Sequence, residues 1–200
     1  MAQRIAHLVR DQGVAGSNPV SPSETMKKNI RVIPLISERR IQRKVRFLAR
    51  QISSEFKNSD LVCVGILKGA WIFMADLIRS LTLPVTCDFL TLASYGAGTE
   101  TSGLVQIISD LKTPIEGRNV LVIEDIVDTG ITLSYIHDLL LIRNPKKLKV
   151  CALLDKPARH RVDVKIDFLG FTIPNRFVVG YGVDYNEQFR NLPYIGYIKQ

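Results

Sequence analysis

Apolar residues recur every three or four positions between Ser37 and Phe56, and arginines and lysines fill most of the positions between them. The apolar positions are Ile41, Val45, Leu48, Ile52 and Phe56. This spacing places them on one face of a helix, and Ser37 stands where an N-cap residue is expected. We therefore expect an amphipathic helix with one buried and one solvated face.

Beyond this helix, short apolar runs alternate with segments of helical character. Strands are expected over 61–66, 84–93, 104–108, 119–123 and 148–154, with a last short strand near Tyr197, and further helices over 70–81 and up to about Arg143. This alternation predicts an α/β fold with right-handed crossovers and a parallel sheet. Ligands of such sheets bind beyond the carboxyl ends of the strands.

Two segments break the pattern. Residues 94–103 are rich in Gly, Ser and Thr and precede a strand, so we expect a mobile hairpin loop able to act as a lid. Residues 1–25 end in a stretch rich in Gly, Ser, Pro and Asn and look like a peptide translated from a transfer-RNA gene. We expect them to be a disordered tail or a spurious extension, and residues 26–200 to form a single domain.

The composition fits a folded protein and favours anionic partners. Hydrophobic residues make up 46% and charged residues 23% of the chain, which excludes a disordered protein. The net charge of +8 attracts anions, a class that includes nucleic acid, acidic membranes and phosphorylated small molecules. Cys63, Cys87 and Cys151 lie far apart, so we expect reduced core residues and not a metal site. No apolar run is long enough to span a bilayer, and the expected compartment is the cytoplasm.

The segment 124–132 follows a buried strand and concentrates the candidate chemistry. Small or hydroxyl residues open the next helix at Thr129, Gly130 and Thr132. Free N–H groups and the positive end of the dipole at such a helix start suit a phosphate. The same edge carries three carboxylates, Glu124, Asp125 and Asp128. Because carboxylates repel a bare phosphate, they are suited to sugar hydroxyls, a hydrated magnesium ion or a proton in transit.

An ordinary helix start explains the same residues. In that interpretation Asp128 is an N-cap and the other two acids are solvated. Charge spacing alone does not decide between the two interpretations.

The whole run 120–133, Val-Leu-Val-Ile-Glu-Asp-Ile-Val-Asp-Thr-Gly-Ile-Thr-Leu, closely resembles the phosphoribosyl pyrophosphate signature of the purine phosphoribosyltransferases. Four other segments resemble further site segments of the hypoxanthine-guanine enzymes in the same order: 64–70, Ser94-Tyr95, 154–156 and 177–190. The resemblance covers the chain from about Pro34 to its end. It implies the α/β, type I phosphoribosyltransferase fold, with a central, mostly parallel sheet flanked by helices, a flexible hairpin loop and a small hood region.

The resemblance also implies a role for each matching residue on the sugar side. Glu124 and Asp125 match the acids that hold the ribose hydroxyls, and Asp128 matches the general base beside purine N7. The 5′-phosphate loop matches Asp128, Thr129, Gly130, Ile131 and Thr132. The pyrophosphate contacts match Lys68 and Gly69, in a loop whose peptide is often cis, together with Arg190. Ser94 and Tyr95 match the flexible loop.

On the purine side, Lys156 matches the lysine that donates to the 6-oxo group. Phe177 matches the ring that stacks on the base, and Val178 the residue whose backbone meets the base edge. Asp184 matches a purine-side residue that also binds Mg²⁺. Magnesium is the implied cofactor, with Glu124, Asp125 and Asp184 as its implied ligands.

The implied activity is transfer of phosphoribosyl from phosphoribosyl pyrophosphate to a 6-oxopurine, hypoxanthine and with it guanine, giving IMP or GMP and pyrophosphate. A xanthine-preferring enzyme remains an alternative, because the 6-oxo group is shared. Two further alternatives are an RNA-binding regulator on the same fold and a catalytically silent sensor of phosphoribosyl pyrophosphate. The regulator carries Tyr where Asp128 stands, and the sensor is expected to lack Asp128 or Lys156, so the presence of both residues argues against these alternatives. A homodimer or homotetramer is implied; neither a membrane nor nucleic acid is expected as a partner.

Taken singly, several of these residues have ordinary explanations. Lys68 and Lys156 would be solvated charges, Phe177 a core residue, and Arg190 a partner of Glu187. Their joint order argues against that set of explanations. Purely structural roles are expected for His137, His160, Trp71 and Tyr181.

Overall fold

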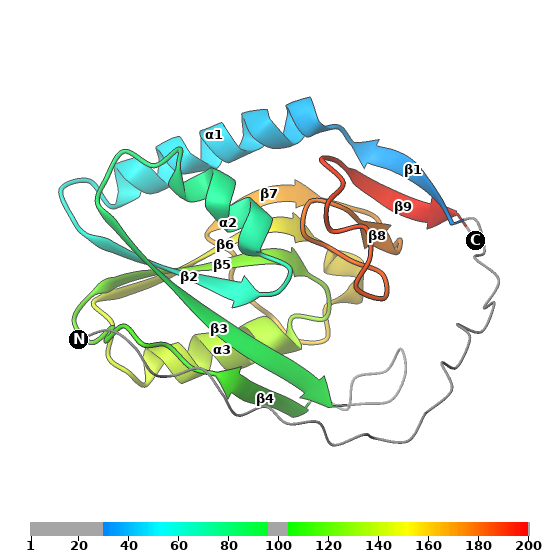
Figure 1. Ribbon diagram of the computed structural model, residues 1–200. Coiled ribbons are helices and arrows are strands. Elements are labelled where there is room, and N and C mark those ends of the chain that lie inside the picture. The colour runs from blue at the N-terminus through cyan, green and yellow to red at the C-terminus, as the bar shows by residue number, and fades with distance from the viewer. Residues whose placement is uncertain (1–29, 96–103, 200) are drawn as a thin grey trace, which may run out of the picture. The chain divides into compact units, whose positions relative to one another are not determined.

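The computed structural model describes residues 30–95 and 104–199, in which strands and helices alternate (Figure 1). In chain order the elements are β1 (Arg31–Ile36), α1 (Glu38–Glu55), β2 (Leu61–Leu67), α2 (Trp71–Ile78), β3 (Val85–Tyr95), β4 (Leu104–Ser109), β5 (Asn119–Val127), α3 (Ile131–Leu141), β6 (Lys147–Asp155), a 3₁₀ turn η1 (Pro157–Arg159), β7 (Phe168–Thr172), β8 (Val178–Val179) and β9 (Ile195–Lys199).

A six-stranded sheet forms the centre, in the order β4-β3-β2-β5-β6-β7. Its strands are parallel except β4, which pairs with β3 as an antiparallel hairpin. Helices α1 and α2 cover one face and α3 covers the other (Figure 1). This arrangement confirms the predicted α/β fold with a mostly parallel sheet.

Alternating residues of the central strands build the two cores. Leu61, Cys63, Leu121 and Ile123 pack on the side of α1 and α2. Their neighbours in the sequence, such as Val62 and Val122, pack on the side of α3. Side chains of a strand point to opposite faces in turn, so an apolar run without polar positions requires cover on both faces.

Helix α1 has the amphipathic character that its sequence predicts. Ile41, Val45, Leu48 and Ile52 are fully buried, and the positions between them are mostly exposed. Ser37 is the N-cap, but its side chain makes no capping bond. Its carbonyl accepts the N–H of Arg40 and Ile41 instead.

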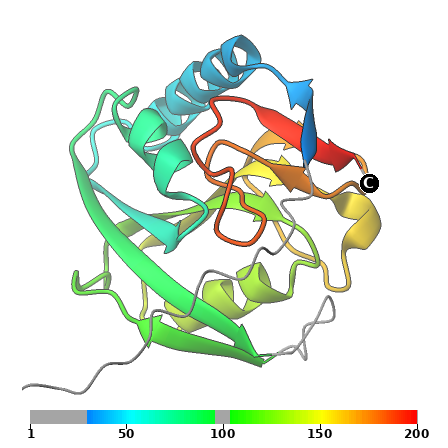
Figure 2. The same ribbon diagram turned by 45° about the vertical axis from the view of Figure 1, so that its right-hand side comes forward.

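A second, antiparallel sheet is formed by β1, β9 and β8 (Figure 2). Arg31 pairs with Lys199 and Ile33 with Tyr197, so both ends of the described chain meet there. With the connections around it, this sheet is the small hood region that the resemblance implies. The predicted strand near Tyr197 is β9.

The structure corrects several element boundaries. Strand β5 continues to Val127, past the predicted end at Ile123, because its neighbour β6 pairs with it up to Asp155. Helix α2 is shorter than predicted and ends at Ile78. Strand β3 includes Tyr95, whereas the sequence predicts a loop from residue 94. The rest of that loop, residues 96–103, lies outside the described residues, and so does the extension 1–25. No helix in the described ranges is long and apolar enough to cross a membrane.

Candidate active site

Loops from the three central strands converge at the carboxyl edge of the sheet. The N–H of Lys156, after β6, donates to the carbonyl of Val127 at the end of β5, at 2.9 Å. The Asp125 carboxylate lies against Gly69, after β2, so closely that a Cβ there would sit 1.9 Å from its Oδ2. Only glycine fits this position, and the predicted pyrophosphate loop is thereby brought to the predicted ribose acids.

A hollow of about 330 Å³ opens at this edge. Its lining residues are Ile126, Asp128, Lys156, Arg159, Asn175, Arg176, Phe177, Val178, Val183 and Asp184. All the residues predicted to contact the purine are among them. The structure therefore brings together the general base and the purine side of the predicted site.

Asp128 stands between two cations in this hollow. Lys156 Nζ lies 3.8 Å from one carboxylate oxygen, and Arg159 Nε lies 2.6 Å from the other. The contact with Arg159 is an ion pair by distance, although its atoms are not aligned as a hydrogen bond. Lys156 is buried, so it is not a solvated surface charge. Burial lowers the pKa of Lys156, and the Asp128 carboxylate opposes that shift.

Phe177 and Val178 form the apolar side of the hollow. The Phe177 ring is exposed and meets Tyr185 edge to face, with ring centroids 5.5 Å apart, so it is not a core residue. Val178 is buried in the short strand β8. An exposed ring beside a lysine and a carboxylate suits a planar heterocycle with polar edges.

A second cluster of charges lies beside the first. Lys68 Nζ is 2.9 Å from Glu187, and Arg190 is 2.9 Å from Asp184 and 3.5 Å from Glu187. The pairing of Arg190 with Glu187, which the sequence offers as its ordinary explanation, is thus present, but it forms part of a cluster that includes Lys68. The Leu67–Lys68 peptide is cis, as the resemblance implies.

The two acids of β5 are costly to keep charged. Burial and the neighbouring Asp125 raise the pKa of Glu124 well above its ordinary value, and one Glu124 oxygen, Oε2, is buried without a hydrogen-bond partner. Burial raises the pKa of Asp125 to about 6. A cation that binds at this edge together with substrate would lower the cost of keeping both carboxylates charged.

Magnesium fits this donor set, because it prefers carboxylate oxygens. Within residues 30–95 and 104–199, however, no three His, Cys, Asp or Glu side chains are gathered around one point. Magnesium is commonly held by one or two protein carboxylates and by substrate oxygens. The acids at this edge are compatible with that mode, and not with an all-protein cage.

The start of α3 lies at the same edge. Gly130, with φ of 82°, is its N-cap, so Asp128 is not the cap and the ordinary helix-start interpretation is wrong. Thr129 and Thr132 are half-buried beside this helix start. The first N–H groups of a helix and its dipole favour a phosphate there.

The segment 180–190 is tied to the helices behind the site. Tyr181 is buried, as expected of a packing residue, and its hydroxyl donates to Asp76 of α2 at 2.5 Å. Gln42 of α1 donates to the same carboxylate at 2.8 Å. Gly182 has φ of 104°, and a Cβ there would lie 2.1 Å from the Gly69 carbonyl. The segment that carries Asp184 and Arg190 is therefore seated against the loop that carries Lys68.

Sequence reasoning missed Arg159 as a partner of Asp128, and it named Glu187 only as a partner of Arg190 and not of Lys68. Arg159 ends the 3₁₀ turn η1, three residues after Lys156. Residues three positions apart lie on the same side of a 3₁₀ turn, so this spacing is the signal that could have placed Arg159 beside Lys156. His160 pairs with the buried Asp155 at 2.7 Å and is half-buried, so it is not a freely exposed residue. Trp71, expected to pack inside, is exposed instead.

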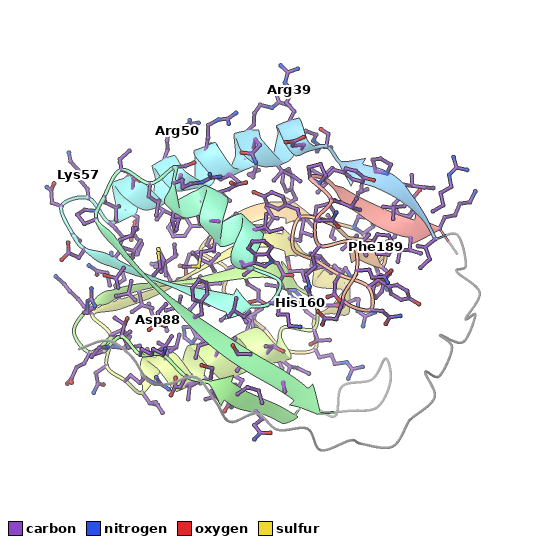
Figure 3. The ribbon with its side chains drawn as sticks, in the orientation of Figure 1. Arg39, Arg50, Lys57, Asp88, His160 and Phe189 are labelled. Atoms are coloured by element: carbon purple, nitrogen blue, oxygen red, sulfur yellow. The ribbon has the colours of Figure 1, made fainter. Side chains whose placement is uncertain are left out.

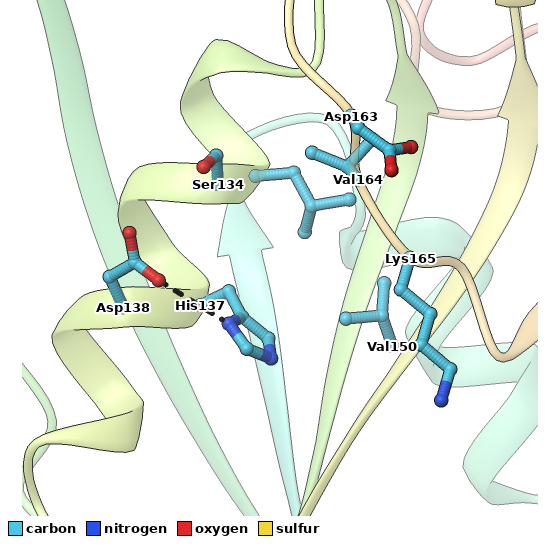
Figure 4. Close-up of a pocket in the computed structure, with 8 residues that line it drawn as sticks. Ser134, His137, Asp138, Val150, Asp163, Val164 and Lys165 are labelled. Carbon is cyan, nitrogen blue, oxygen red and sulfur yellow. Dashed lines mark ion pairs between the residues drawn. The ribbon is translucent and has the colours of Figure 1, made fainter.

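A different hollow of about 260 Å³ lies along α3 and shares no lining residue with the first (Figure 4). Leu133, Val150 and Val164 form its apolar part, and His137 lies 3.6 Å from Asp138 at its rim. Asp163 and Lys165 add one charge of each sign. This lining favours no particular class of ligand.

Known proteins share this architecture. A model of the phosphoribosyl transferase domain matches residues 36–186. The hypoxanthine-guanine phosphoribosyltransferase of Bacillus subtilis (strain 168) is 49% identical over 174 residues, which is 87% of this chain and 96% of the relative. The hypoxanthine phosphoribosyltransferase of Salmonella typhimurium is 47% identical over 173 residues, 86% of this chain and 96% of that one. A crystal structure of a Staphylococcus aureus hypoxanthine phosphoribosyltransferase matches with a TM-score of 0.81 at 44% identity, over 90% of this chain and 97% of that chain.

Proposed function

The chain belongs to the phosphoribosyltransferase family, on its hypoxanthine-guanine branch, and from this premise we propose that it acts in purine salvage. It transfers the phosphoribosyl group of phosphoribosyl pyrophosphate to hypoxanthine, and to guanine, giving IMP or GMP and pyrophosphate. The observation that carries the proposal is the hollow in which Asp128 and Lys156 stand together beside the exposed ring of Phe177.

In the proposed reaction the purine lies against Phe177. Lys156 donates a hydrogen bond to the 6-oxo group, and the backbone of Val178 meets the base edge. Asp128 then accepts the proton lost from the ring nitrogen as the new bond forms. Arg159, whose Nε lies 2.6 Å from one Asp128 oxygen, has to release that oxygen for the purine to reach it.

The sugar phosphate lies on the other side of Asp128. The N–H groups of Thr129, Gly130, Ile131 and Thr132 hold the 5′-phosphate, and Glu124 and Asp125 hold the ribose hydroxyls. Negative charge near the ring also favours the positive charge that develops on the ribose when pyrophosphate leaves.

Lys68, Gly69 and Arg190 hold the pyrophosphate. Asp125, Asp184 and Glu124 supply the carboxylates for Mg²⁺, which neutralises charge on the leaving group when bound. Closure of the loop that begins at Ser94 and Tyr95 excludes water from the activated sugar.

Asp128→Asn tests this function. We expect kcat/KM for hypoxanthine to fall by about 10² to 10⁴, the usual contribution of a positioned base. Asp138→Asn, an exposed position on α3, removes the same charge and is expected to leave the rate unchanged. Turnover is followed as pyrophosphate release with hypoxanthine, guanine and xanthine offered separately. Turnover of none of these bases by the unaltered protein contradicts the proposal, and a preference for xanthine changes its substrate.

The protein is further proposed to work in the cytoplasm as a homodimer or homotetramer. Trp71 and Phe89 are large apolar side chains left exposed on neighbouring elements, and a second copy would cover them. Sedimentation of the protein at micromolar concentration measures its assembly state, and a monomer there contradicts this part of the proposal.

A further inference from the structure

Four arginines form a straight line along the outward side of α1. Arg39, Arg43, Arg46 and Arg50 are separated by four, three and four residues, which places them one above the other on a helix. We call them the arginine stripe. All four are exposed, and Arg39 and Arg50 point away from the body of the protein (Figure 3).

No carboxylate in the described part of the chain neutralises the arginine stripe. Among the described residues, none of its members forms an ion pair, and the two acids of α1 stand at its ends. Glu55 is already paired with Lys147 at 2.9 Å. With Arg40 and Lys44 counted, α1 holds six cations and two acids, a net of +4 within a chain of net +8.

This arrangement does not help the helix itself. Like charges three or four positions apart repel each other. Arg39 and Arg40 also lie in the first turn, where the positive end of the helix dipole disfavours cations. The fully buried face of α1 carries its stability, so the stripe is not needed to hold the helix in place.

We propose that the arginine stripe binds the phosphate backbone of single-stranded nucleic acid without sequence preference. The eleven residue-to-residue steps from Arg39 to Arg50 give the stripe a length of about 16 Å. Arginine presents a planar fork of donors that matches phosphate oxygens. Phe47, on the same helix, is 44% exposed with Lys44 Nζ 5.3 Å from its ring centroid, and an exposed aromatic ring beside cations offers a surface on which a base stacks.

A membrane fits this surface less well. Amphipathic helices bind bilayers by inserting an apolar face, and the apolar face of α1 is already buried against the sheet. Nucleic acid is not expected as a partner from the sequence, but the structure places a net charge of +4, half of the net charge of the chain, on the single helix α1. The proposed binding does not depend on the proposed catalytic activity, since no stripe residue lines the candidate site.

The test measures binding of a fluorescent 20-nucleotide RNA of mixed sequence by anisotropy between 50 and 200 mM salt. With four phosphates engaged, the logarithm of the affinity is expected to fall with a slope of about −2.8 against the logarithm of salt, roughly 50-fold over this range. The stripe variant replaces Arg39, Arg43, Arg46 and Arg50 by Gln. The matched control replaces four other exposed cations, Arg31, Lys112, Lys146 and Lys199, by Gln, so that both variants lose the same charge.

We expect the stripe variant to lose most of the affinity and of the salt slope, and the control to keep most of both. Thermal unfolding of each variant shows that it is folded. Equal losses in the two variants, or no RNA binding by the unaltered protein at 50 mM salt, overturn the proposal. Stripe-dependent binding to phosphatidylserine vesicles or to polyglutamate that matches or exceeds binding to RNA also overturns it.

Discussion

At the residue scale, the candidate site is held by ion pairs that substrates would have to replace. Lys68 lies 2.9 Å from Glu187, and Asp128 lies 2.6 Å from Arg159. Lys68 and Glu187 are each nearly two-thirds exposed, so their pair is screened by solvent and weak. A diphosphate can therefore displace the Glu187 carboxylate at little cost.

Replacing Glu187 by Gln removes this competitor. We expect the KM for phosphoribosyl pyrophosphate to fall severalfold and inhibition by pyrophosphate to tighten by a similar factor, because Lys68 and Arg190 are then free of its charge. Glu55→Gln is the matched control, since Glu55 also pairs with a lysine at 2.9 Å but lies away from the site. A higher KM in Glu187→Gln than in the control would show that Glu187 orients the cations and does not compete with substrate.

Asp125 makes stability depend on pH. Its pKa is raised by burial to about 6 in the folded protein, so between pH 4 and 6 the folded state binds more protons than the unfolded state. The free energy of unfolding therefore falls as pH rises through this range, and Glu124 acts in the same direction. We expect Asp125→Asn to stabilise the protein by about 1–3 kcal/mol at pH 8 and by much less at pH 4. Urea unfolding at the two pH values measures the difference, and an equal effect at both would refute this cause.

The predicted site residues that the structure gathers at one edge of the sheet lie in continuous motifs, such as 124–132. Their partners were not predictable, because contact depends on the fold. Lys68 and Glu187 are 119 positions apart, and nothing in the local sequence around either one indicates the other. Arg159 is nearer to Lys156, yet only the 3₁₀ turn places both beside Asp128.

At the element scale, the segment 180–190 and the loop after β2 form one unit. Gly182→Ala introduces a methyl group 2.1 Å from the Gly69 carbonyl at a φ of 104°. We expect a loss of about 1–3 kcal/mol in stability and at least a tenfold loss in kcat/KM for phosphoribosyl pyrophosphate, because Lys68 and Arg190 move apart.

Gly117→Ala is the control for backbone strain alone. Gly117 also has a positive φ, of 66°, but a Cβ there meets nothing within 4 Å. It is expected to lose about 1 kcal/mol in stability and to keep its activity. Equal kinetic losses in the two variants would contradict a specific role for the contact between the two loops.

The predictability of elements follows their burial. Strands β2, β5 and β6 lie in the middle of the sheet and read as apolar runs, so the sequence predicts them with errors only at their ends. Strands β1, β7 and β8 were not predicted. They lie in the small sheet or at the edge of the large one, and β8 has only two residues, too few for a periodic pattern.

At the scale of the whole molecule, residues 26–200 are proposed to contain everything that the activity requires. A chain that begins at Met26 is expected to keep the kcat/KM and the melting temperature of the full chain. A chain that begins at Ser37, after β1, is expected to unfold at lower temperature, since it lacks the partner of β9. A loss of activity in the first variant, measured as pyrophosphate release, would place part of the function in residues 1–25.

The pairing of β1 with β9 also has a consequence for biosynthesis. Arg31 pairs with Lys199, so β1 leaves the ribosome early but waits for its partner until residues 195–199 have been translated. Arg190, a proposed contact for pyrophosphate, is translated only shortly before residues 195–199. A nascent or prematurely terminated chain is therefore expected to be inactive even where its six-stranded sheet has already folded.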